Sequence, residues 1–191
     1  SHDPDGFNRW DAGQRLAVDV IQSLVGAPDD ADIEPRLVEA YRKLISDTDL
    51  DQALVAKMLQ LPSEAYLIEL TENADVPAIH RARDSVLRHL AGALKGELID
   101  CYQRQQDSGP YEVTPEAIAR RSLRNTALAW LLMIDDEEGR GLAVSQLNAA
   151  DNMTDRMGAL RALVNSGYEA DRQKALDHFY DRFQDDPQVV E

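Results

Sequence analysis

Histidines come first among the residues that could do chemistry, because paired imidazoles can hold a catalytic metal ion. The chain has four, namely His2, His80, His89 and His178. Zinc hydrolases that carry their site on a helix use His-Glu-x-x-His, in which two imidazoles one turn apart reach one ion and the Glu acts as the base. No two of these histidines are three to five residues apart. The spacing predicts no zinc site and no catalytic residue within this chain.

Cys101 is the single cysteine. A thiol acts as a nucleophile when a histidine lies beside it, but Cys101 falls on the apolar stripe of an expected helix, which favours a small core residue. A single cysteine cannot form an internal disulfide, so small disulfide-built secreted scaffolds are excluded. We expect an inert thiol and a cytoplasmic location.

Two further stretches contain residue types that bind calcium or phosphate, but their residues are not spaced as in known sites of either kind. The acidic run at 135–138 lacks the alternating oxygens and the closing Glu of a calcium loop, so the start of a solvated helix is favoured. Gly139-Arg140-Gly141 is too short to cradle a phosphate group. Neither stretch predicts a ligand.

One basic stretch is concentrated, Ala119-Arg120-Arg121-Ser122-Leu123-Arg124-Asn125. On a helix, Arg120 and Arg124 share a face and could clamp a carboxylate, either a partner's or one within the protein. Because the chain is so acidic, we favour an internal salt bridge, and the clamp for a partner stays open as the alternative.

The elements that position these residues are all predicted to be helices. Apolar residues recur with a period near 3.6, without a strand pattern, in about nine stretches. They lie at 10–24, 35–45, 51–61, 63–71, 75–106, 114–134, 140–149, 154–165 and 168–184. Short turns join them, and no fixed sequence repeat is visible. We therefore predict an all-α fold of antiparallel helix pairs, an irregular right-handed superhelix of the HEAT-like α-solenoid type, as a single domain over 1–191.

Local signals refine these helices. Asp51, Asp75 and Thr114 are predicted N-caps, and the glycines at 92 and 96 predict a kink in the longest helix. The helix at 114–134 is apolar on more than one side, which indicates neighbours on two faces.

Charge and hydropathy limit the partners. The 20 Lys and Arg against 35 Asp and Glu give a formal net charge of −15, so nucleic acid would be repelled. No apolar run approaches the roughly 18 to 20 residues that span a bilayer. The chain begins at Ser1 rather than Met, and we expect it to be a piece of a longer polypeptide.

The opening stretch places Phe7, Asn8, Arg9 and Trp10 at the entry of the first helix, where a chain end would usually fray. Two aromatic rings there indicate a surface that packs against something. We predict that Phe7 and Trp10 form a hydrophobic staple at the start of this helix.

Three segments resemble the bacterial aminopeptidase N family of zinc metallopeptidases, the gluzincins. His-Asp-x-Asp-x-Phe-Asn-Arg-Trp-Asp-Ala at 2–12 is similar to the start of the family's C-terminal helical domain. Ile118 to Asn125 resembles the family's Ala-Lys-Arg-Thr-Leu-Arg-Asn, and the third segment, 149–155, contains Asn-Met-Thr-Asp. The resemblance spans essentially the whole chain.

The resemblance implies the first part of a C-terminal helical domain that caps the active site and encloses the peptide substrate. In that family the catalytic domain holds the zinc through two His and one Glu, and none of those residues is implied for this chain. Residues 7–10 would then pack against the preceding domain. We expect the isolated chain to self-associate through such uncovered apolar surface.

Two other functions stay open. A free-standing helical-repeat adaptor that binds a protein or peptide would need only the fold. An autonomous hydrolase using Cys101 or the histidines would require activity from this chain alone. A His-Glu-x-x-His sequence upstream in the same reading frame would separate the aminopeptidase domain from the adaptor.

Overall fold

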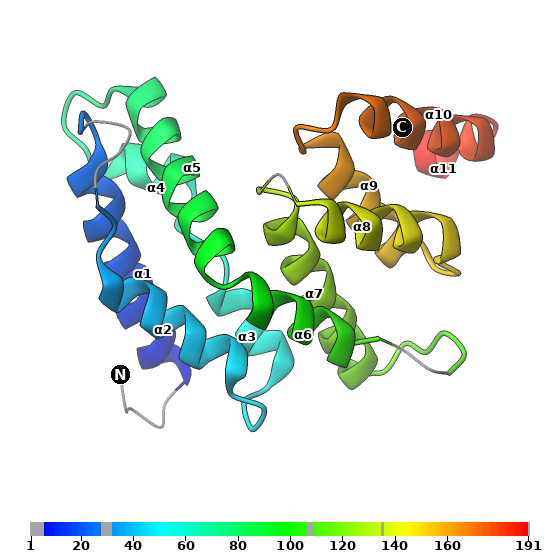
Figure 1. Ribbon diagram of the computed structural model, residues 1–191, viewed down its shortest axis with the longest axis horizontal. Coiled ribbons are helices and arrows are strands. Elements are labelled where there is room, and N and C mark those ends of the chain that lie inside the picture. The colour runs from blue at the N-terminus through cyan, green and yellow to red at the C-terminus, as the bar shows by residue number, and fades with distance from the viewer. Residues whose placement is uncertain (1–5, 28–31, 107–108, 135, 191) are drawn as a thin grey trace. The chain divides into compact units, whose positions relative to one another are not determined.

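The computed structural model describes residues 6–27, 32–106, 109–134 and 136–190, and within these ranges every regular element is a helix (Figure 1). The helices are α1 (Gly6–Leu24), α2 (Pro35–Ser46), α3 (Gln52–Met58), α4 (Glu64–Glu69), α5 (Val76–Ala93), α6 (Lys95–Arg104), α7 (Pro115–Leu131), α8 (Glu137–Ala149), α9 (Met153–Val164), α10 (Glu169–Phe183) and α11 (Pro187–Val190). The all-α prediction is confirmed. None of the described helices is both long and apolar enough to cross a membrane.

The chain divides into two compact units, Ser1–Glu97 and Leu98–Glu191. In the first unit, α1 packs on α2, α3 and α5, and α4 packs on α5. The side chains that fill its core are fully buried and aliphatic, among them Ile21, Leu37, Ile79, Val86 and Leu90. In the second unit, α9 packs on α7, α8 and α10. A single domain over 1–191 stays a prediction.

The predicted N-caps form as expected. The carboxylates of Asp51 and Asp75 accept hydrogen bonds from the backbone N–H groups of Leu54 and Ala78, at 2.8 and 3.0 Å. The Thr114 hydroxyl accepts from Ala117 in the same way. Each oxygen satisfies a donor that a helix start otherwise leaves unpaired.

The predicted long helix at 75–106 is two helices. The backbone leaves helical geometry at Leu94 (φ −116°, ψ 16°), between Gly92 and Gly96, so the predicted kink is a full break. Arg42 of α2 holds both sides of the break: its Nε donates to Glu97 at 2.7 Å and its Nη2 donates to the carbonyl oxygen of Ala93 at 3.3 Å.

In the second unit, α7 is buried on several sides, as its pattern predicts. Its buried apolar side chains are Ala117, Ala119, Leu123, Ala127, Leu128, Trp130 and Leu131. It ends at Leu131, three residues earlier than expected. The acidic run starts the next helix, since Asp136 caps α8 by accepting from the Gly139 N–H at 2.9 Å; Asp135 lies outside the described residues.

Candidate interdomain surface and polar network

Phe7 and Trp10 stack on each other at the start of α1. Their ring centroids are 5.8 Å apart with the planes tilted by 40°. The predicted hydrophobic staple is wrong, because a staple needs one ring before the helix and both rings lie within α1. The Phe7 side chain is 67% exposed, so the pair presents apolar surface outward.

Trp10 also lines two hollows in the first unit. One, of about 690 Å³, is lined mostly by α1 and the connection between α3 and α4, and its apolar wall includes Val18, Leu61, Tyr66 and Leu70. The other, of about 590 Å³, lies between α1 and α2 and includes Leu16, Tyr41 and Leu44. Tyr66 and Leu70 are nearly half exposed. We call these three aromatic side chains and one leucine, namely Phe7, Trp10, Tyr66 and Leu70, the aromatic surface.

The two polar residues of the opening stretch lie differently. Asn8 is exposed. The guanidinium of Arg9 is half-buried, with its Nη2 3.9 Å from the Asp47 carboxylate just after α2. Arg9 therefore contacts the neighbouring α2 region, whereas Phe7 and Asn8 are exposed.

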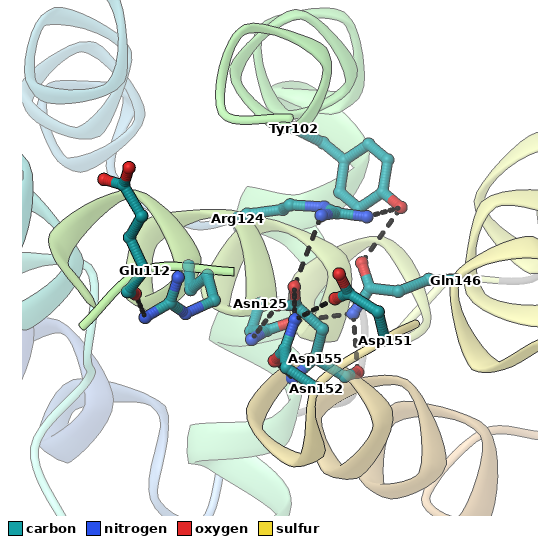
Figure 2. A network of polar contacts seen from close by, with 9 residues as sticks. Tyr102, Glu112, Arg124, Asn125, Gln146, Asp151, Asn152 and Asp155 are labelled. Carbon is teal, nitrogen blue, oxygen red and sulfur yellow. Dashed lines mark hydrogen bonds and ion pairs between the residues drawn. The ribbon is translucent and has the colours of Figure 1, made fainter. Parts of the chain in front are cut away.

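The basic stretch of α7 contributes to a polar network in the second unit (Figure 2). Arg124 is 15% exposed, and its Nη1 lies 3.5 Å from the Asp155 carboxylate on α9. Its Nη2 donates to the Tyr102 hydroxyl of α6 at 3.3 Å. Arg120 lies one turn earlier on α7 and is half-buried. Arg124 therefore pairs with a carboxylate of the same chain, and a clamp that uses both Arg120 and Arg124 stays a prediction.

Asp155 is the centre of this network. Its two carboxylate oxygens accept hydrogen bonds from the side-chain amides of Asn125, at 3.0 Å, and Asn152, at 3.1 Å. Its backbone N–H donates to the Asn152 side chain at 2.9 Å, which caps α9. The Asp155 side chain is only 5% exposed, so these partners replace the water that an ionised carboxylate would otherwise bind.

Gln146 of α8 completes the network. Its side-chain nitrogen donates to Asn125 at 2.7 Å and to the Asp155 carbonyl oxygen at 2.8 Å, and its oxygen accepts from the Tyr102 hydroxyl at 3.0 Å. Four helices, α6 to α9, each contribute to it (Figure 2). Its polar groups pair with one another except for the buried Nε of Arg124, which has no hydrogen-bond partner among the described residues, and the shared bonds specify how these helices pack.

Gly158 allows the network to form. A Cβ atom at this position of α9 would lie 2.4 Å from the Asn125 side-chain oxygen, far inside van der Waals contact. The sequence motifs contained Arg124, Asn125, Asn152 and Asp155. The sequence analysis did not predict a role for Tyr102, Gln146 or Gly158. A glutamine on the inner face of a helix is a signal that could have identified Gln146.

Cys101 is fully buried in the second unit. Burial raises the pKa of its thiol to about 11, an effect that the nearby positive charge of Arg104 opposes. The thiol therefore stays protonated at neutral pH and is a poor nucleophile.

The histidines that the structure describes do not assemble a metal site. His80 and His89 are exposed, and the Nδ1 atom of His80 lies 2.8 Å from the Glu64 carboxylate of α4. His178 is half-buried on α10, and His2 lies outside the described residues. Across the part of the chain that the structure describes, no three His, Cys, Asp or Glu side chains are grouped to hold a metal ion. The described donors do not fit the zinc that the resemblance implies for its relatives.

Comparisons with known proteins agree with the sequence motifs. A family described as "Domain of unknown function (DUF3458_C) ARM repeats" matches residues 1–191. Aminopeptidase N of Caulobacter vibrioides is 35% identical over 190 residues, 99% of this chain and 22% of that protein. Aminopeptidase N of Escherichia coli is 35% identical over 168 residues, 85% of this chain and 19% of that protein.

Among solved structures, Legionella pneumophila aminopeptidase A in complex with aspartic acid matches with a TM-score of 0.80 and 25% identity, over 98% of this chain and 23% of that one. The chain thus spans about a fifth of the length of the relatives it matches. The resemblance to the C-terminal region of bacterial aminopeptidase N is confirmed. The chain belongs to the DUF3458_C family of ARM-repeat domains.

Proposed function

We propose that this chain is a noncatalytic helical domain of a zinc aminopeptidase, which caps the active site and encloses the peptide substrate. The observation that carries this proposal is the match of essentially the whole chain to a fifth of each aminopeptidase N. Zinc and the catalytic residues would be held by other domains of the polypeptide, since the described residues offer no donor set for the metal. The lone cysteine supports a reducing compartment, which we propose to be the cytoplasm.

The aromatic surface is the part of the first unit that we assign to contact with the preceding domain. It combines a mostly exposed Phe7 with a Trp10 that borders two hollows. Large aromatic side chains carry much of the binding free energy at interfaces, because each buries a large apolar area. Arg120 and Arg124 remain candidates for a clamp on a partner's carboxylate, although the pairing of Arg124 with Asp155 favours a structural role.

Docking through this surface is tested in the complete polypeptide. Phe7→Asp is expected to lower hydrolysis of an alanyl anilide at least tenfold and to speed proteolysis at the domain junction. The physical reason is that burying a Phe side chain is worth about 1.5 to 3 kcal/mol and that a carboxylate in its place resists desolvation. Helix content by circular dichroism should stay unchanged.

Val113→Asp is the matched control, since Val113 is 71% exposed in the loop before α7 and lies in the second unit. Equal losses from Phe7→Asp and Val113→Asp would contradict docking through the aromatic surface. The adaptor hypothesis would replace the aminopeptidase domain if the complete reading frame lacked His-Glu-x-x-His.

Without its neighbour, the chain is expected to self-associate through the same surface. Sedimentation velocity between about 5 and 200 μM should show a mass that rises above the 21.3 kDa of one chain. Phe7→Asp should return the mass toward that of the monomer and Val113→Asp should not. A wild-type mass that is independent of concentration would count against the prediction.

A further inference from the structure

Arg156 of α9 is a buried cation that pairs with no carboxylate in the part of the chain that the structure describes. Arg156 is 8% exposed, and its Nη2 donates a hydrogen bond to the carbonyl oxygen of Ala150. Its Nε is buried and has no hydrogen-bond partner. Within the described residues Arg156 forms no ion pair, in contrast to Arg124, which pairs with Asp155, the residue directly before Arg156 in α9.

A second arginine lies close to Arg156. The guanidinium of Arg156 is 5.5 Å from the centroid of the Phe183 ring, and that of Arg182 is 6.0 Å from the same centroid. Burial, and then repulsion by Arg182, lower the pKa of Arg156, while attraction by Asp151 opposes them. Two like charges thus gather at one ring in a chain whose net charge is −15.

An unpaired buried guanidinium is costly, because the group has lost water without gaining an opposite charge. Its planar donors match the two oxygens of a carboxylate. The neighbouring face of α10 is open and largely apolar: Leu176 and Tyr180 are 42% and 60% exposed, and the Phe179 and Phe183 ring centroids are 4.8 Å apart. Asp177 and Asp181 border the same hollow as Leu176 and Tyr180. Apolar surface beside a positive pair fits a protein segment rather than a small free anion.

We propose that Arg156 and Arg182 bind the carboxylate of an Asp or Glu side chain from a segment outside these 191 residues, which packs on the exposed face of α10. The inference rests on the proposed function only in that the chain is part of a longer polypeptide. The relatives, of which it spans about a fifth, have room for such a segment.

The test compares the melting temperature of the Arg156→Met variant with that of the wild type. It is measured once in the 191-residue chain and once in a polypeptide extended to the length of the relatives, and the sign of the change is the readout. In the chain, removing an unpaired buried charge should leave the melting temperature unchanged or raise it. In the extended polypeptide the same variant breaks an ion pair and should lower the melting temperature of the helical region by about 5 °C or more. Arg161→Met is the control, because Arg161 lies on the exposed side of α9. It should change the melting temperature of neither the chain nor the extended polypeptide.

Two results would overturn the assignment. A lower melting temperature for Arg156→Met in the chain would mean that Arg156 is already satisfied there, and an unchanged value in the extended polypeptide would mean that no carboxylate docks. Sodium acetate, compared with sodium chloride at equal ionic strength, separates the source of the carboxylate. If acetate stabilises the extended wild-type polypeptide but not its Arg156→Met variant, the site is open to a free carboxylate ligand and no segment occupies it. These outcomes are measured without peptidase activity, so a failure of this inference can be told apart from a failure of the proposed function.

Discussion

Asp155→Ala is expected to cost the second unit about 3 to 5 kcal/mol of its free energy of unfolding, because it leaves the buried Arg124 without its counter-charge. The same change removes the acceptor of the Asn125 and Asn152 amides. The half-buried Asn125 amide loses this acceptor, whereas the Asn152 amide keeps its hydrogen bond to Asp151. Few single substitutions outside the apolar core should destabilise this protein as much.

The measurement should report on the second unit alone. The chain has two tryptophans, Trp10 in the first unit and Trp130 in the second, and Trp130 is 5% exposed. Urea unfolding followed by fluorescence in a Trp10→Phe background therefore follows α7 and its neighbours. A lower midpoint at unchanged slope is the expected signature of lost stability.

Asp151→Ala is the matched control, because Asp151 is an exposed acid four residues earlier that accepts a hydrogen bond from the Asn152 side chain and forms no ion pair among the described residues. It should change the free energy of unfolding by less than about 1 kcal/mol. Asp155→Asn should fall between the two, since it keeps an acceptor oxygen and loses the charge. Equal effects of Asp151→Ala and Asp155→Ala would show that Asp155 does not stabilise the network.

Features that depend on neighbours in the chain could be predicted from the sequence. The N-caps at Asp51, Asp75 and Thr114 each accept a hydrogen bond from the backbone N–H three residues later. Donor and acceptor are close in sequence, so the residue pattern alone predicts the contact. The break at Leu94 follows from the two glycines that flank it. The prediction of a hydrophobic staple at Phe7 was wrong because the pattern located the helix but not its first residue, and Phe7 lies inside α1.

The polar network could be predicted only in part. The basic stretch indicated that an arginine of α7 would find a carboxylate, but nothing local says that the carboxylate is Asp155, 31 residues beyond Arg124. The motifs at 118–125 and 149–155 looked like separate marks of a family, and the structure shows that they meet in one network (Figure 2). Gln146 and Tyr102 join that network through α8 and α6, so their roles exist only after the helices have packed.

Gly158→Ala is expected to destabilise the second unit by roughly 2 to 3 kcal/mol, although alanine is the better helix former. The new Cβ would lie 2.4 Å from the Asn125 side-chain oxygen. That side chain cannot move aside without cost, because Gln146 donates to its oxygen and its nitrogen donates to Asp155. The loss of these hydrogen bonds outweighs the gain of about 1 kcal/mol in helix propensity.

A double-mutant cycle separates this clash from a general effect on α9. With Asn125→Ala already present the obstacle is gone, so adding Gly158→Ala should be neutral or should raise the free energy of unfolding by up to about 1 kcal/mol. Gly141→Ala is the control for propensity, because Gly141 is an exposed glycine of α8 whose Cβ would meet open space, and it should stabilise the chain in either background. If Gly158→Ala were equally destabilising with and without Asn125, the close approach of α7 and α9 at this position would not be what requires glycine.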